Sequence, residues 1–225
     1  MTTRRTWRQV AFAAAVVLAS ACVTTTDGTT PRPPAGCPGI AIDFGNLESY
    51  RNRRLGIEIA ARYGAPVLAA APGVVVFVGE RRAGPQVREN ADLNKAVVIY
   101  HGGMLTSTGE EWFVATHYDR LSRFADGLEE GDYVRRGQRL GDNGASGASG
   151  LDAAPRLHFA TKASGSADID RGHSWLNPHE FWWQAAPGER AIHPFDPAQD
   201  YGDPASAEDW TPATRISGLT YPTAC

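Results

Sequence analysis

Two side chains in the stretch "APRLHFA", residues 154–160, could do chemistry together. Arg156 and His158 are two residues apart in what reads as a short strand, so both point to the same side of it. An imidazole can bind a metal or carry a proton, whereas a guanidinium stays protonated and has no lone pair to give. The two residues are therefore either exposed surface residues with no functional role or a metal site in which one ligand has been replaced.

The strand that carries this pair belongs to a series of short β-rich runs separated by turn residues. Such runs occupy residues 56–60, 65–70, 73–80, 95–102, 111–118, 132–141 and 156–163. A helical pattern appears only in "NPHEFWWQA", where Asn177 can cap a helix that starts at Pro178. We expect a mostly β fold: a single antiparallel β-sheet domain with a short C-terminal helix and an irregular tail.

The N-terminus predicts export. A basic start with Arg4, Arg5 and Arg8 precedes the apolar run "VAFAAAVVLASA", so residues 1–21 read as a signal peptide. The run is too short for a good membrane span. Cys22 follows small residues, and "LASAC" resembles a bacterial lipobox, although "ASA" alone also suits ordinary signal cleavage. We favour lipidation of Cys22, which predicts a lipid-anchored protein of the cell envelope (periplasm) that touches the membrane only through its anchor.

The amino-acid composition indicates which class of partner is excluded and where the chain divides into a tether, a folded domain and an extension. Loss of residues 1–21 removes three arginines, which leaves 19 basic against 25 acidic residues and a net charge of −6. This acidic balance argues against nucleic acid as a partner. Residues 22–36 lack apolar periodicity and predict a flexible tether, residues 37–183 the folded domain, and residues 184–225, rich in Pro, Asp and Ala, an irregular C-terminal extension.

Two cysteines, Cys37 and Cys225, flank the mature domain. They could pair in an oxidising envelope compartment and join the two ends of the chain. The alternative is a pair of unrelated thiols, and no C-x-x-C spacing supports a cysteine zinc site.

Four stretches, taken in order, resemble the lysostaphin-type (LytM-like) zinc endopeptidases, secreted enzymes that cut the peptide cross-links of bacterial peptidoglycan. They match the family's H-x-G-x-D start and hairpin, its Y-x-H-L strand, its G-D-x-V-x-x-G-Q-x-I-G signature and its P-H-L-H-F strand. The matching segments are "RRLGIEIAARYGAPVLAAAPGVVVFVG", "ATHYDRL", "GDYVRRGQRLG" and "PRLHF". The resemblance covers roughly residues 54–183 and implies a compact antiparallel β domain with a groove along one face.

The resemblance also implies where an active site would lie, and the residues there depart from the family. The first zinc histidine is replaced by Arg54 and the zinc aspartate by Glu58, while His158 keeps its ligand position. His117 takes the catalytic position of Y-x-H-L, and Arg156 replaces its catalytic partner. A catalytic zinc needs three protein ligands, so we expect a degenerate metal site and no cofactor, with zinc only if the site proves functional.

Without zinc, Glu58 would need another cation, which Arg54 or Arg156 could supply through a two-pronged hydrogen bond. The resulting ion-pair groove, with Arg54 and Arg156 as substrate-binding residues, predicts a non-catalytic domain that binds peptidoglycan stem peptides or regulates a cell-wall hydrolase. The alternative is an active zinc metalloendopeptidase in which Glu58, His158 and His117 work with an unrecognised third ligand, for which His173 and His179 are candidates. A third possibility is a scaffold whose tail, residues 184–225, binds another protein.

Overall fold

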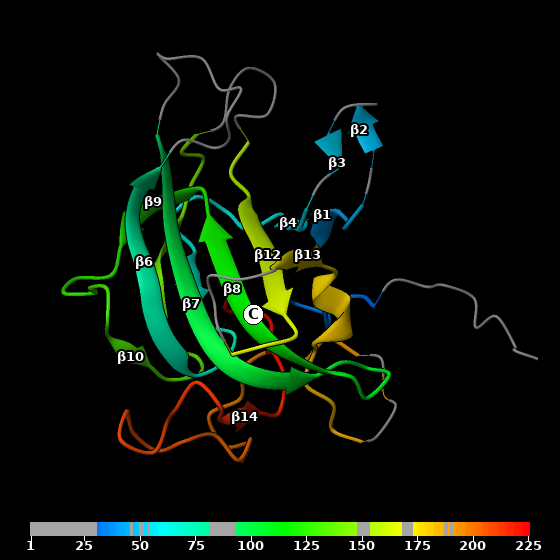
Figure 1. Ribbon diagram of the computed structural model, residues 1–225. Helices are drawn as coiled ribbons and strands as arrows, with labels where there is room; N and C mark the ends of the chain where they lie inside the picture. The colour runs from blue at the N-terminus through cyan, green and yellow to red at the C-terminus, as the bar shows by residue number, and fades with distance from the viewer. Residues whose placement is uncertain are drawn as a thin grey trace, which may run out of the picture.

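A computed structural model describes residues 31–45, 47–49, 52–53, 55–81, 93–147, 154–167, 173–186, 189 and 191–225 (Figure 1). The predicted signal peptide, the lipidation site Cys22 and residue Arg54 lie outside these residues. None of the helices in the described part of the chain has the length and apolar character needed to cross a membrane.

The main sheet has the strand order β1-β4-β12-β8-β7-β6-β10, and every neighbouring pair along this path is antiparallel. Figure 1 shows the long strands β6, β7 and β8 side by side and bending together. The strands of this path are β1 (Ile40–Ile42), β4 (Ile57–Ile59), β6 (Gly73–Arg81), β7 (Asn94–Leu105), β8 (Glu111–Asp119), β10 (Tyr133–Val134) and β12 (Leu157–Ser164). The mostly antiparallel β fold expected from the sequence is confirmed.

Smaller elements complete the fold. β13 (Ser174–Leu176) pairs with β12, and β14 (Arg215–Ile216) pairs in parallel with β7. A second sheet joins β5 (Pro66–Leu68), β11 (Arg139–Asn143) and β9 (Leu121–Phe124), and β2 (Leu47–Ser49) pairs with β3 (Asn52–Arg53). The single sheet expected from the sequence is thus a large sheet with two smaller ones beside it.

The two faces of the main sheet differ because successive side chains of a strand point to opposite sides. One face is apolar and carries the core, in which the largest side chains of the central strands are fully buried. Its members include Ile57, Ile59, Ile99, Tyr118, Leu157 and Phe159. The residues between them, Glu58, His117, Asp119 and His158, therefore lie on the opposite face.

The predicted C-terminal helix is much shorter than its sequence pattern. Asn177 caps it as expected, with its side-chain oxygen accepting from the amide of His179, but the helix is one 3-10 turn, η2 (Pro178–Glu180). The next residues are held by the tail instead: Trp182 forms a β-bridge with Leu219, and the amide of Trp183 donates to the Leu219 carbonyl oxygen. Tertiary contacts with the tail thus end the helix after one turn.

The tail, residues 184–225, has little regular secondary structure but packs against the rest of the domain. Leu219 and Tyr221 are completely buried, and short bridges join Pro194 to Tyr221 and Val67 to Thr223. The tail, orange to red in Figure 1, supplies β14 at the end of β7. It belongs to the same hydrophobic core as the main sheet.

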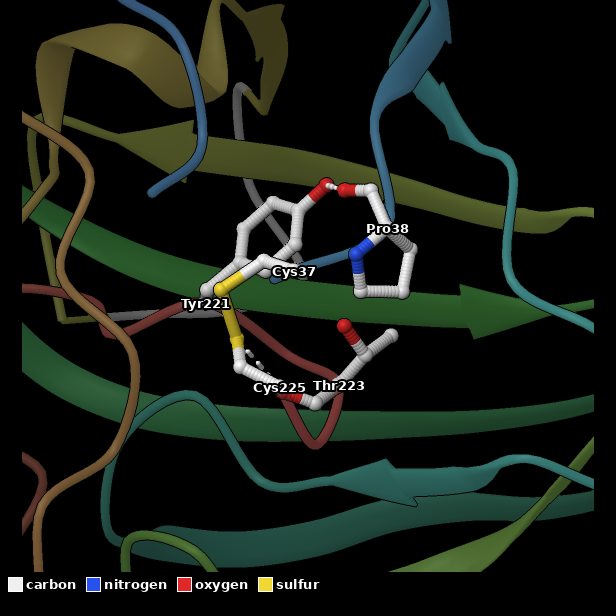
Figure 2. Close-up of a disulfide and its surroundings, with 5 residues drawn as sticks. All are labelled: Cys37, Pro38, Tyr221, Thr223 and Cys225. Atoms are coloured by element: carbon white, nitrogen blue, oxygen red, sulfur yellow. Dashed lines mark hydrogen bonds between the residues drawn. A yellow bond between two sulfur atoms is a disulfide. The ribbon is translucent and has the colours of Figure 1, made fainter. Parts of the chain in front are cut away.

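A disulfide joins Cys37 to Cys225, residues 188 positions apart in the sequence (Figure 2). Beside it, the Tyr221 hydroxyl donates to the carbonyl oxygen of Pro38 over 2.7 Å. Burial raises the pKa of Tyr221, so this hydroxyl remains a donor at all physiological pH values. The start of the domain and the end of its tail are therefore held together covalently and by a buried hydrogen bond.

Replacing both cysteines by serine (C37S/C225S) is expected to lower the free energy of unfolding by about 3–5 kcal/mol, because the disulfide closes a very long loop in the unfolded chain. Urea unfolding with and without dithiothreitol measures this. Reductant should destabilise the wild type and leave C37S/C225S unchanged. A wild type that is equally stable with and without reductant would contradict the assignment.

Candidate functional site

Strand pairing brings three polar residues into one row on the face of the main sheet opposite the larger core. His158 on β12 lies directly opposite Glu58 on β4 and directly opposite Asp119 on β8. Directly opposed residues have Cβ atoms about 4.5–5.5 Å apart, so the register alone makes these three side chains neighbours. His117 lies one step along β8 on the same face, opposite Ala160.

Glu58 is the most buried charged residue of this row, with 1% of its surface exposed. Its Oε1 lies 3.1 Å from His158 Nδ1, and its Oε2 lies 3.2 Å from Arg120 Nη1. A carboxylate this far from water requires a nearby cation or donors. Among the described residues, Arg120 supplies this positive charge, a role that was not expected from the sequence.

Arg120 occupies the sharp corner between β8 and β9. Its φ of 71° lies in the left-handed region, and no other described residue except glycine has a positive φ. This conformation costs a residue with a side chain about 1 kcal/mol. Asn94 holds the corner, because its Oδ1 accepts from the Arg120 amide and its Nδ2 donates to Asp119 Oδ1, both over 2.8 Å. The corner directs the guanidinium of Arg120 toward Glu58.

The other predicted cations are placed differently. Arg156 is half-buried just before β12, and its amide donates to the carbonyl oxygen of Gly144 over 3.2 Å. The described ion pairs do not include one between Arg156 and Glu58. Arg54, the other residue expected to neutralise Glu58, lies outside the described residues.

His117 is held by Arg81 and Trp175. The Arg81 Nη2 lies 3.1 Å from His117 Nδ1 and 2.8 Å from Asp119 Oδ1. The Trp175 ring lies 4.9 Å from the imidazole, centroid to centroid. Burial lowers the pKa of His117 to about 3, with Asp119 opposing the shift and Arg81 adding to it. The imidazole is therefore neutral at physiological pH.

Two further histidines, His101 and His179, have structural partners. His101 is fully buried, with Nδ1 2.8 Å from the Pro72 carbonyl oxygen and Nε2 2.7 Å from the Thr116 hydroxyl. Burial lowers its pKa to about 3, so it is a neutral core residue. His179 Nδ1 accepts from the Trp182 indole, and its Nε2 lies 2.8 Å from Asp43.

Across the part of the chain that the structure describes, no three His, Cys, Asp or Glu residues are grouped so that they could hold a metal ion. His173 and His179, the candidate replacement ligands, do not form such a group with Glu58 and His158. Glu58 and His158 are brought together as predicted, and His117 lies on the same face.

One sequence signal for Arg120 was present. The stretch "ATHYDRL" contains Tyr118-Asp119-Arg120-Leu121, which fits the Y-x-H-L pattern letter by letter with Arg120 in place of the histidine. From the sequence, the histidine of this pattern was instead expected at His117, the nearest histidine. Asn94 and Arg81 carried no comparable signal, because their positions depend on the pairing of distant strands.

Comparison with known proteins agrees with this architecture. The model of peptidase family M23 matches residues 52–170, more than half of the chain. The chain belongs to this family. No curated protein matches it.

Solved structures with a similar chain include the catalytic domain of the prophage-encoded M23 protein EnpA from Enterococcus faecalis, solved as a point mutant. It is 25% identical, with a TM-score of 0.42, over 60% of this chain and 88% of that one. The antimicrobial peptidase lysostaphin from Staphylococcus simulans is 23% identical, with a TM-score of 0.41, over 57% of this chain and 45% of that one. A zinc-containing peptidase from Vibrio cholerae is 23% identical, with a TM-score of 0.40, over 58% of this chain and 35% of that one. The chain thus spans less than half of the last two proteins.

Arg120→Ala is expected to lower the free energy of unfolding by about 3 kcal/mol, because it removes a cation from a buried carboxylate. Adding Glu58→Gln should recover part of this loss, so the R120A/E58Q double variant should be more stable than the two single effects added together predict. Urea unfolding measures all three variants.

The matched control is Arg123→Ala, which removes an exposed arginine three residues away that pairs with Asp142. It should change stability much less than R120A. Additive effects of R120A and E58Q would show that the two side chains do not interact.

Proposed function

We propose that this chain is a non-catalytic, LytM-like domain of the cell envelope that binds peptidoglycan stem peptides, either on its own or while regulating a separate cell-wall hydrolase. The observation that carries the proposal is the pairing of the buried Glu58 carboxylate with Arg120 and His158. Export through the predicted signal peptide, and anchoring through a lipid on Cys22, would place the domain next to peptidoglycan.

The residues at this site do not fit a catalytic zinc. A zinc site needs three protein ligands that offer lone pairs, and the guanidinium of Arg120 offers none. It also places a fixed positive charge 3.2 Å from the carboxylate that a zinc ion would need. Arg156 and, by the sequence resemblance, Arg54 add two further guanidinium groups where the family has histidines. We infer that charge once supplied by a metal is supplied here by arginine.

The same substitutions favour binding over cutting. Arginines are strong donors to carboxylates, and peptidoglycan stem peptides carry several carboxylates. A guanidinium cannot act as a general base at neutral pH, so the arginines can hold a peptide but cannot activate water. The arrangement thus retains the means to bind the family's substrate class without the means to hydrolyse it.

Purified peptidoglycan sacculi test this proposal. We expect the exported chain to co-sediment with sacculi and to release no new amino groups from them, whether or not zinc is added. Arg156→Gln should weaken binding roughly tenfold through loss of a charge-assisted hydrogen bond. Arg215→Gln, which removes an exposed arginine paired with Glu111, is the control and should bind like the wild type.

Zinc-dependent release of amino groups would contradict the proposal and would favour the alternative function, an active zinc metalloendopeptidase that cleaves peptidoglycan peptide cross-links. Absence of binding to sacculi would contradict it as well. In that case, pull-down of a hydrolase by the wild type and by the Arg156→Gln variant would separate a role for the site around Glu58 from a role for another surface.

A further inference from the structure

We infer that His117, Lys162 and Trp175 form a subsite for a peptide carboxylate, in which His117 acts as a fixed hydrogen-bond donor. This inference rests on the proposed function and concerns residues other than the substituted positions Arg54 and Arg156. The three residues come from β8, β12 and β13, three strands that pair side by side in the order β8-β12-β13.

His117 contacts Arg81 through one ring nitrogen, and this contact determines which nitrogen carries the ring proton. An arginine can only donate hydrogen bonds, and the Arg81 Nη2 faces His117 Nδ1 at 3.1 Å. Nδ1 must therefore be the acceptor, and the ring proton must be on Nε2. Nε2 makes no hydrogen bond to any side chain or backbone group in the described part of the chain. His117 thus offers an N–H donor on the face of the sheet that carries Glu58 and His158.

Lys162 places a positive charge beside this donor. Lys162 lies opposite Trp175 on β13, and its ammonium nitrogen is 5.5 Å from the centroid of the indole ring. Lys162 also lies opposite Ala115, two residues before His117, so it is a diagonal cross-strand neighbour of the imidazole. No carboxylate among the described residues forms an ion pair with Lys162. Its positive charge is therefore available to a ligand.

The chemistry of these three side chains indicates the kind of ligand that the subsite would bind. An N–H donor and an ammonium group beside a half-buried indole match an anionic oxygen group attached to a small apolar body. The carboxylate of a short peptide has this chemistry, with the apolar part lying against Trp175. Asp119 does not repel it fully, because Arg81 and Asn94 both bond to its Oδ1.

The spacing suits an extended peptide. Lys162 and His158 point to the same side of β12 and are four residues apart, which corresponds to about 13 Å along a strand. An extended peptide of about four residues covers this distance. Such a peptide could reach from the Glu58–His158–Arg120 cluster to the subsite at Lys162.

Two measurements on the full exported chain test this inference. The ¹⁵N shifts of the His117 ring should show the tautomer with the proton on Nε2. Titration with a muramyl pentapeptide, followed by NMR, should then give binding that weakens about tenfold or more when the peptide carboxylates are converted to amides. Inorganic phosphate at the same concentration should not displace the peptide.

Matched variants assign the effect to the subsite. Lys162→Met should weaken binding of the free carboxylate form about tenfold, and His117→Phe should weaken it several-fold while keeping a ring against Trp175. His117→Gln, which retains an N–H donor, should bind within about twofold of the wild type. Lys95→Met removes a lysine already paired with Glu80 and should have no effect.

The outcomes separate this inference from the proposed function. Binding to sacculi that is unaffected by K162M and H117F would overturn the subsite while the proposed function stands. Equal affinity for the amidated peptide, displacement by phosphate, or an Nδ1-protonated His117 would also overturn it. If the wild type binds neither the peptide nor sacculi, the subsite and the proposed function are both overturned.

Discussion

The polar residues on the face of the main sheet opposite the larger core are organised around one buried carboxylate that must be neutralised. Glu58 is almost completely removed from water, and an ionised carboxylate in that position is costly unless a cation and hydrogen-bond donors surround it. In a zinc peptidase the metal would supply that charge. Here Arg120 and His158 contact its two oxygens, so the strained corner at Arg120 and the Asn94 clamp that holds it follow from the same requirement.

The rest of the fold keeps this face in place. The larger hydrophobic core lies on the other side of the main sheet, where side chains from β4, β12, β8 and β7 pack together, while a small cluster of Val98, Tyr100 and Ala115 packs on this face. The tail completes that core with Leu219 and Tyr221, and the Cys37–Cys225 disulfide fixes its end to the start of the domain. The strand register that sets Glu58, His158 and Asp119 in a row is thus stabilised by packing and by a covalent link on the opposite face.

The sequence predicted the strands well because β-branched runs with turn residues between them are a local signal. The runs at 56–60, 73–80, 95–102, 111–118 and 156–163 each overlap an observed strand. The helix after Asn177 was predicted too long, because its pattern is local whereas its end is set by the distant bridge from Trp182 to Leu219. The short strand β9 was missed for a similar reason, since it is defined by its pairing with β11.

The site was predictable only in part. Glu58 and His158 could be placed together from the family motifs, and the register confirms that they are neighbours. The role of Arg120 could not be inferred by searching for histidines, because the pattern Y-x-H-L carries an arginine here. Arg81 lies on β6, whereas His117 and Asp119 lie on β8, and β7 pairs with both strands. These contacts depend on the pairing of three strands, and no local sequence pattern predicts such pairing.

We propose that the Arg120 guanidinium takes the place of a metal at Glu58. The most direct test is the zinc content of the protein, purified without added metal and then dialysed against a mild excess of zinc. The account predicts far less than one zinc per chain, because Arg120 already pairs with the carboxylate that the ion would need. Close to one tightly held zinc per chain would contradict it and would mean that another residue has rebuilt the metal site.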